Sequence, residues 1–147
     1  MIALVLIIFI LVLLYLISVP AQKEHFAIAS LKEHLGKIDP VFETFDIREG
    51  TSSYTEDKSI IYICLYDEHG KMYPMNTLVY VTLHEASHVM NKSDYGHTAA
   101  FYKIFDKLLC KAAALGVYDP SQPHVKTYCG VDISGIKMPT CTAEHLE

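Results

Sequence analysis

The sequence predicts an α+β fold. A small, mostly antiparallel sheet is expected to pack on a helix that carries two histidines and on a second long helix, after a single N-terminal transmembrane helix. Three observations lead to this prediction. Residues 2–19 form an unbroken apolar run, residues 59–66 are rich in β-branched and aromatic side chains, and residues 77–90 and 98–115 carry apolar side chains at helical spacing.

Charge is unevenly distributed along the 147 residues. Hydrophobic residues make up 51% of the chain and charged residues 20%, with a net charge of −5, but no charged residue or histidine precedes Lys23. This pattern excludes a multi-pass membrane protein, a basic nucleic-acid coat protein and a long disordered protein. We therefore divide the chain into a transmembrane anchor at 1–20, one folded domain at 21–133 and a flexible C-terminal tail at 134–147.

The apolar run at residues 2–19 has the length of a membrane span. As a helix it would extend roughly 27 Å, close to the hydrocarbon thickness of a bilayer, and it has no polar face. A cleaved signal peptide is the alternative, because residues 19–21 resemble a cleavage site, although no basic residue precedes the run. Lys23 and Lys32 follow it, so the positive-inside rule predicts a single-pass membrane protein whose C-terminal domain is cytosolic.

The first half of the folded domain is expected to hold one helix and the sheet. Residues 22–35 carry an apolar stripe and favour a helix. Residues 41–47 have extended character, and residues 59–66 form the clearest strand, followed by a turn and a short return segment at 71–75.

Two long helices follow in the second half. Asn76 is a good N-cap for the helix at 77–90, and Gly116 is expected to end the helix at 98–115. Residues 126–133 form either a last strand or an ordered loop.

The helix at 77–90 carries the motif H-E-x-x-H, with His84, Glu85 and His88. Residues four apart lie one turn apart on the same helix face, so the two imidazoles can share one Zn²⁺ ion. Glu85 lies at the edge of that face, where its carboxylate can reach a water activated by the metal without binding the metal itself. The alternative is a chance match, but the rest of this helix is core-like, and these polar side chains would be costly to bury unpaired.

A catalytic zinc needs a third protein ligand and one open position. His97 follows Gly96, which lets the chain turn back, so His97 is the expected third ligand. Asp94, in the same loop, and Asp106, on the second helix, are the alternatives. The metzincin class is excluded because Asn91 and Asp94 stand where its pattern requires Gly and His.

Residues 60–105 contain IIYICLYDEHGKMYP, then LHEASH, then GHTAAF, with Phe101 four residues after the third histidine. This order of strand and hairpin, HExxH motif and Gly-His step resembles the WLM/SprT-like group of minimal zinc metalloproteases. The resemblance covers about a third of the chain. It implies a minimal zincin-like fold, zinc bound by His84, His88 and His97, and Glu85 as the general base.

The activity that this resemblance implies is hydrolysis of peptide bonds in a protein or peptide substrate, by an endopeptidase. Glu85 would take a proton from the attacking water and pass it to the leaving amine. Tyr128 is a candidate oxyanion donor if the C-terminal stretch folds back over the cleft. The alternative is that Tyr128 is a packed core tyrosine. Tyr95 is a weaker candidate for the oxyanion donor. Residues 60–66 are a candidate strand for pairing with an extended substrate.

Two other functions stay open at this point. One is a non-catalytic, membrane-anchored interaction protein that zinc merely stabilises, although a structural zinc site has no need of Glu85. The other, from the resemblance, is a protease acting on DNA-bound proteins. A net charge of −5 and the lack of a basic run make nucleic acid an unlikely partner. The four cysteines form no CxxC pair and permit two disulfides without requiring them.

Overall fold

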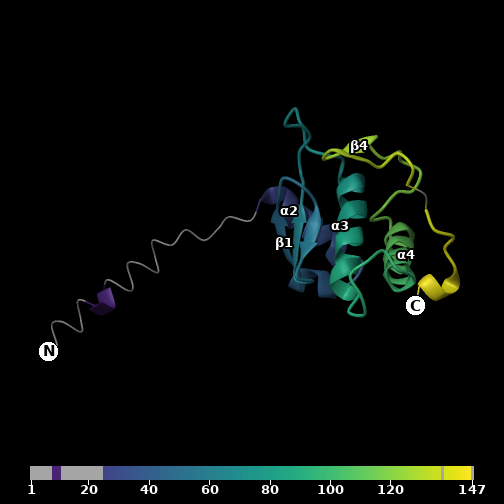
Figure 1. Ribbon diagram of the computed structural model, residues 1–147, viewed down its shortest axis with the longest axis horizontal. Coiled ribbons are helices and arrows are strands. Elements are labelled where there is room, and N and C mark those ends of the chain that lie inside the picture. Colours follow the sequence, from purple (N-terminus) through teal and green to yellow (C-terminus); the bar gives the residue numbers. More distant parts are fainter. Residues whose placement is uncertain (1–7, 11–24, 137, 147) are drawn as a thin grey trace.

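The computed structural model describes residues 8–10, 25–136 and 138–146. Helix α3 (Met75–Met90) stands at the centre, with a small sheet on one side of it and helix α4 (Ala99–Ala114) on the other (Figure 1). The predicted α+β character of the folded domain therefore holds, and the motif helix is the middle layer.

The sheet has three strands, β1 (Asp46–Glu49), β2 (Tyr54–Glu56) and β3 (Ile60–Ile63), in the order β1-β3-β2. β3 runs parallel to β1 and antiparallel to β2, so the sheet is mixed and the prediction of a mostly antiparallel sheet is wrong. The clearest predicted strand lies in its centre. Residues 57–59 join β2 to β3, and Asp57 and Lys58 have positive φ angles of 48° and 51°, as is common in tight hairpin turns. This leaves β2 as the edge strand beside α3.

Helix α2 (Phe26–Gly36) and the 3-10 helix η1 (Pro40–Thr44) precede the sheet. The predicted apolar stripe of α2 is buried, and α2 packs on η1 and α3. The extended segment expected at 41–47 is wrong over its first part, because Pro40 favours a helical start and the Asp39 carboxylate accepts a hydrogen bond from the backbone N–H of Val41.

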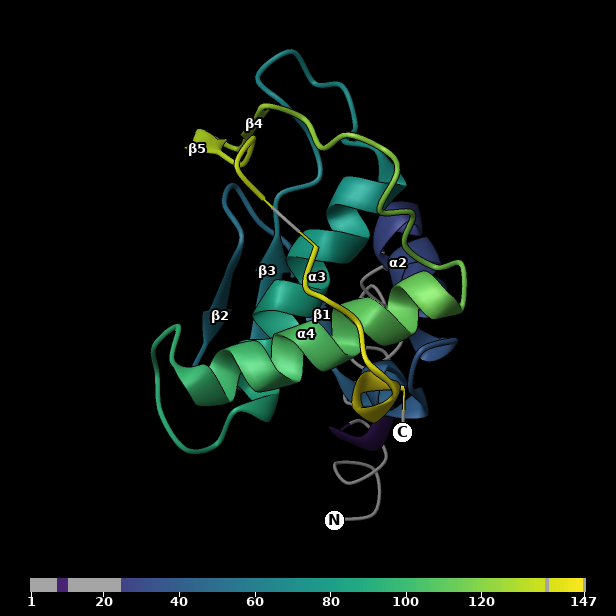
Figure 2. The same cartoon turned by 90° about the vertical axis from the view of Figure 1, so that its right-hand side faces the viewer.

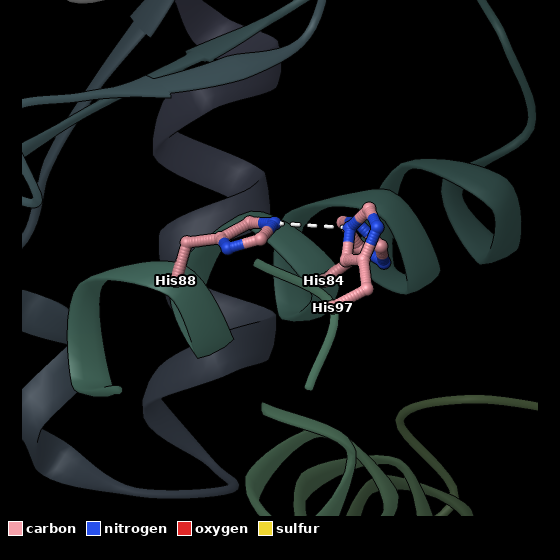
Figure 3. A group of neighbouring side chains, drawn as sticks. All are labelled: His84, His88 and His97. Atoms are coloured by element: carbon pink, nitrogen blue, oxygen red, sulfur yellow. Dashed lines mark hydrogen bonds between the residues drawn. The ribbon is translucent and has the colours of Figure 1, made fainter. Parts of the chain in front are cut away.

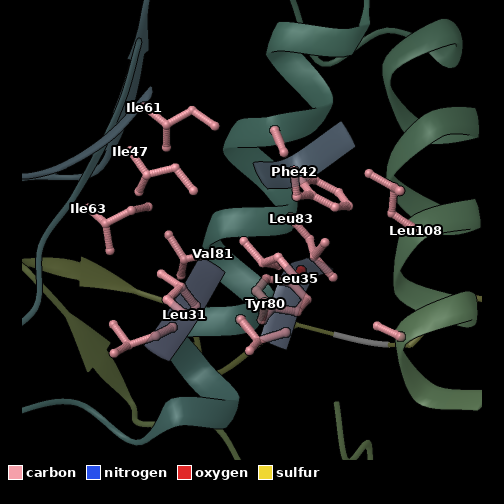
Figure 4. Close-up of a cluster of buried hydrophobic side chains, with 14 of the residues drawn as sticks. Leu31, Leu35, Phe42, Ile47, Ile61, Ile63, Tyr80, Val81, Leu83 and Leu108 are labelled. Carbon is pink, nitrogen blue, oxygen red and sulfur yellow. The ribbon is translucent and has the colours of Figure 1, made fainter. Parts of the chain in front are cut away.

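Side chains from both neighbouring layers bury most of α3, including Leu83 on its core-facing side. Ile47, Ile61 and Ile63 reach it from the sheet, and Leu108 reaches it from α4 (Figure 4). This two-sided burial explains why the helix is apolar almost all the way round.

The predicted cap of α3 has a different role in the structure. α3 begins two residues earlier than expected, after Pro74, and the Asn76 side chain makes no cap bond. Its amide instead accepts from the backbone N–H of Asp119 at 2.7 Å and donates to the Asp119 carbonyl at 3.0 Å. Asn76 therefore fastens the chain after α4 to the start of α3.

The C-terminal part forms a short hairpin and a last 3-10 helix. Gly116, at φ 68°, follows the end of α4 as predicted, and Thr98, expected as the first residue of the helix, is its N-cap. β4 (Thr127–Tyr128) and β5 (Val131–Asp132) pair antiparallel, and η2 (Ala143–His145) packs on α4 (Figure 2).

Both disulfides that the cysteine count permits are present. Cys64 is bonded to Cys129, in the turn of the β4–β5 hairpin, and Cys110 on α4 is bonded to Cys141. The chain after α4 is thus joined covalently to the core at two points.

The structure contradicts the predicted transmembrane helix. It therefore also contradicts the prediction of a single-pass membrane protein with a cytosolic domain, because that prediction depended on the helix. Crossing a bilayer takes about 20 consecutive apolar helical residues, and no helix among the described residues is both long and apolar enough. The longest described helices, α3 and α4, have 16 residues each. Of the predicted anchor at 1–20, only residues 8–10 lie within the described part of the chain.

Candidate metal centre

His84 and His88 lie one turn apart on α3, as the motif spacing predicts. Their ring centroids are 5.2 Å apart. The burial of the rest of α3 fixes the rotation of the helix, so this His face is turned away from the sheet and toward the start of α4 (Figure 3).

His97 completes the cluster from the loop between α3 and α4. Its Nε2 atom lies 2.9 Å from Nε2 of His84 and 3.2 Å from Nε2 of His88, and all three rings point toward one another (Figure 3). Two nitrogens bound to one tetrahedral zinc, each at about 2.0–2.1 Å, would be roughly 3.3 Å apart. The His84, His88 and His97 cluster could therefore hold a metal ion.

A network of polar side chains shapes the loop that delivers His97. The Asp94 carboxylate accepts hydrogen bonds from the Asn91 amide at 2.7 Å and from the Thr98 hydroxyl at 2.8 and 2.9 Å. The Lys58 ammonium donates to the backbone carbonyls of Asn91 and Asp94. Asp94 is thus engaged in holding the loop and is not part of the ligand cluster, nor is the other alternative, Asp106.

Phe101 forms the floor of the cluster. Its ring is fully buried on α4 and lies 4.9, 4.4 and 4.8 Å, centroid to centroid, from the rings of His84, His88 and His97. The phenylalanine four residues beyond the third histidine therefore restricts the orientation of all three imidazoles.

Burial keeps His84 and His88 neutral and available as ligands. It is the main cause that lowers the pKa of His84 to about 4, and the neighbouring imidazoles of His97 and His88 lower it further. The pKa of His88 is also lowered, first by burial and then by His97 and the Lys58 ammonium. Only the neutral ring can bind a metal, so both side chains suit this role at pH 7.

Glu85 lies beside the cluster without joining it. Its side chain is 8% exposed, and its Oε2 atom accepts a hydrogen bond from the Thr55 hydroxyl at 2.9 Å. Burial raises the pKa of the Glu85 carboxyl, and the bond from Thr55 opposes this. A carboxylate with a raised pKa next to an open metal position is suited to accept and return a proton.

His84, Glu85 and His97 open onto a hollow of about 370 Å³, which we call the apolar hollow. Tyr80 and Val81 line it from the preceding turn of α3. Its opposite wall comes from the C-terminal segment, through residues that include Val131, Ile133 and Ile136.

Tyr128 lies where the C-terminal stretch folds back over the cleft, and its ring lines the apolar hollow. Its hydroxyl donates to the Cys64 carbonyl and is bonded to the Ser53 hydroxyl, each at 2.7 Å, and the residue is 4% exposed. Burial raises the pKa of this phenol to about 12. Tyr95, the weaker candidate, is 84% exposed beside Lys58. The role of Tyr128 as an oxyanion donor stays a prediction.

Sequence reasoning missed Thr55 and the apolar wall. Thr55 stands 30 residues before Glu85 on a three-residue strand, and no local pattern marks it. The alternation of apolar and polar residues from Val131 through Asp132 to Ile133 was the signal available for the wall.

The comparisons with known proteins found two similar viral proteins. The chain is 42% identical over 103 residues to uncharacterized protein 042R of Invertebrate iridescent virus 3, covering 66% of this chain and 64% of that protein. It is also 42% identical over 86 residues to uncharacterized protein 136R of Invertebrate iridescent virus 6, covering 56% of this chain and 48% of that protein. The match thus spans less than two thirds of each relative. No family model and no solved structure matches the chain.

Proposed function

We propose that this protein is a zinc-dependent peptidase that hydrolyses peptide bonds, with His84, His88 and His97 as metal ligands and Glu85 as general base. One observation carries the proposal: three imidazole Nε2 atoms converge from α3 and the following loop, and the carboxylate of Glu85 lines the same hollow.

The set of donors fits a catalytic zinc better than a structural one. Structural zinc sites are closed by four protein ligands, whereas catalytic sites take three and keep one position open. The described residues bring three ligand side chains together, and all three are imidazoles. Among these residues, no cysteine or carboxylate joins them as a fourth ligand. When bound, zinc supplies Lewis-acid chemistry that polarises a carbonyl and makes water more acidic.

Glu85 performs the proton transfers in this proposal. Its carboxylate accepts a proton from the water that attacks the scissile carbonyl and donates that proton to the leaving amine. The Thr55 hydroxyl holds Oε2, which leaves the other carboxylate oxygen for this exchange.

The sheet edge supports a polypeptide as the substrate. β2 is the edge strand that lies beside α3, and Thr55 on β2 is bonded to the Glu85 backbone as well as to its side chain. An exposed strand edge can pair with an extended peptide through backbone hydrogen bonds. We therefore assign this pairing to β2, rather than to β3, which was expected from the sequence but lies in the centre of the sheet.

Zinc content and proteolysis of an unfolded protein test the proposal. The full chain is expected to bind one equivalent of zinc and to cleave reduced, carboxymethylated casein. Glu85→Gln should keep the zinc and lower kcat/KM by about 10²- to 10⁴-fold, the usual contribution of general acid–base catalysis.

Glu33→Gln is the matched control, since this glutamate is exposed on α2. It should leave both measurements unchanged. A Glu85→Gln variant as active as the wild type, or a wild type that binds no zinc, would overturn the proposal.

A further inference from the structure

The apolar hollow has a distinct chemical character. Tyr80 and Val81 face it from α3, and Val131, Ile133 and Ile136 face it from the C-terminal segment. Val131 is 60% exposed at β5 although it is an aliphatic side chain. The hollow therefore offers apolar surface that this chain itself leaves uncovered.

Charge is nearly absent from the lining. Among the described residues, Glu85 is the only Asp, Glu, Lys or Arg that lines the hollow, and its Oε2 atom is already bonded to Thr55. A charged side chain entering the hollow would lose its hydration, which is costly next to so much apolar surface. An acidic side chain would also be repelled by Glu85. The lining thus selects against charge and for apolar surface.

The size of the hollow limits what it can take. Its volume of about 370 Å³ is near the lower end of ligand pockets, which span roughly 300–1,000 Å³. This is room for one large side chain with its adjoining backbone, next to the two ligand histidines that also line the hollow.

The wall that carries Val131 is held in place by its turn. Cys129 and Gly130 form the two-residue turn of the hairpin with positive φ angles of 43° and 83°. Cys129 is bonded to Cys64, and its backbone N–H donates to the Tyr73 hydroxyl at 2.9 Å. A wall fixed at its turn gives a preformed pocket, which binds with less loss of entropy than one that must order on binding.

We propose that the apolar hollow is the specificity pocket of this peptidase, and that it takes a large aliphatic or aromatic side chain flanking the cleaved bond. The substrate class is therefore polypeptides with such a residue beside the scissile bond, and Val131 is a specificity-determining residue. This inference rests on the proposed function, because it places the pocket beside the reacting carbonyl.

Cleavage-site profiling tests the pocket. The zinc-loaded full chain is incubated with a peptide library, and the cleaved bonds are identified by mass spectrometry. Leu, Ile, Met, Phe and Tyr are expected at one flanking position at least about tenfold above Asp, Glu and Lys, a range that hydrophobic pockets reach. Val131→Asp should remove most of this preference, whereas Val131→Leu should keep it.

Val41→Asp is the matched control, because Val41 is a partly exposed aliphatic residue on η1 that does not line the hollow. It should leave the profile unchanged. Cleavage by the wild type with no apolar enrichment at either flanking position would overturn the pocket and leave the peptidase proposal standing.

A binding measurement keeps the two proposals separable if no peptide is cleaved. The methyl NMR signals of Val131 and Ile133 are followed while N-acetyl-phenylalanine amide or N-acetyl-lysine amide is added to the zinc-loaded protein. Saturable shifts with the phenylalanine probe alone support the pocket. No shift with either probe rejects it, whatever the activity.

Discussion

Thr55 is the residue that most directly restrains Glu85. Its hydroxyl donates to Oε2 and to the backbone carbonyl of Glu85, both at 2.9 Å. This double contact connects the sheet edge to the motif helix, and it restrains the orientation of the carboxylate.

Removing the Thr55 hydroxyl should therefore slow catalysis without disturbing the metal. A hydrogen bond to a charged group contributes about 1.5–3 kcal/mol, so Thr55→Val is expected to lower kcat by about tenfold or more. Zinc content should not change, and Thr55→Ser should restore most of the rate. Thr44→Val, on η1, serves as control; a Thr55→Val enzyme with wild-type kcat would reject this positioning role.

The buried imidazole of His84 makes the stability of the metal-free protein depend on pH. Its pKa is about 4 in the folded chain, against an ordinary value of 6.5. Between these pH values the unfolded chain binds a proton that the folded chain does not, so the free energy of unfolding falls as the pH decreases from about 6.5 toward 4.

Urea denaturation of the metal-free protein at several pH values measures this effect. His84→Gln should reduce the slope of the free energy of unfolding against pH between pH 6.5 and 4. His69→Gln should not, since His69 is exposed on a turn. An unchanged slope in His84→Gln would assign the pH dependence to other groups.

The loop between α3 and α4 determines how well the third ligand is placed. His88 and His97 are nine residues apart, and Asp94 fixes the intervening turn by bonds to Asn91 and Thr98. The loop is thus a preorganised part of the metal centre although Asp94 itself binds no metal.

Asp94→Ala should loosen the loop and weaken zinc binding. Partners that orient metal ligands typically contribute about 10- to 100-fold in affinity, so we expect an increase in Kd of about tenfold, measured by competition with a chelating dye. Asp46→Ala, which removes an exposed carboxylate paired with Arg48, should leave the Kd as it is. An unaltered Kd for Asp94→Ala would show that the loop holds His97 without this carboxylate.

Elements with strong local signals were predicted well from the sequence. The apolar stripe of α4, its Thr98 cap and the glycine after its end are all encoded within a few residues, so the predicted 98–115 lies close to the observed Ala99–Ala114. The N-terminus of α3 was predicted less well. Asn76 has the residue type of a cap, but a contact with Asp119, 43 residues away, takes its side chain.

The two disulfides connect the chain after α4 to earlier parts of the molecule. Cys64–Cys129 closes a loop with a sequence separation of 65, and Cys110–Cys141 closes one with a separation of 31. Both limit the freedom of the unfolded chain, and the longer loop limits it more.

Replacing Cys64 and Cys129 together by alanine should destabilise the protein by about 2–4 kcal/mol. The matched Cys110→Ala/Cys141→Ala variant should lose somewhat less, because its loop is shorter. Urea denaturation of both variants measures the difference in free energy of unfolding. If the Cys64→Ala/Cys129→Ala variant had the same urea midpoint of unfolding as the wild type, the Cys64–Cys129 disulfide would not stabilise the protein in the way proposed.

At the scale of the whole molecule, the apolar N-terminal run was the weakest basis for a prediction. Its hydropathy and length alone suggested a membrane span, but no described helix has the properties of one. The composition of a segment shows that it is apolar but does not by itself determine the structure that the segment adopts.

The sequence by itself determined the core of the candidate centre. His84, Glu85 and His88 lie in one helical turn, where the 3.6-residue period sets their relative positions, and His97 follows within one short loop. The tertiary structure alone decided that β2 is the sheet edge, that Thr55 holds Glu85 and that the β4–β5 hairpin walls the apolar hollow. The contacts of Thr55 and of the β4–β5 hairpin join residues 30 or more positions apart, so they arise from how the layers pack around α3 and not from any local pattern.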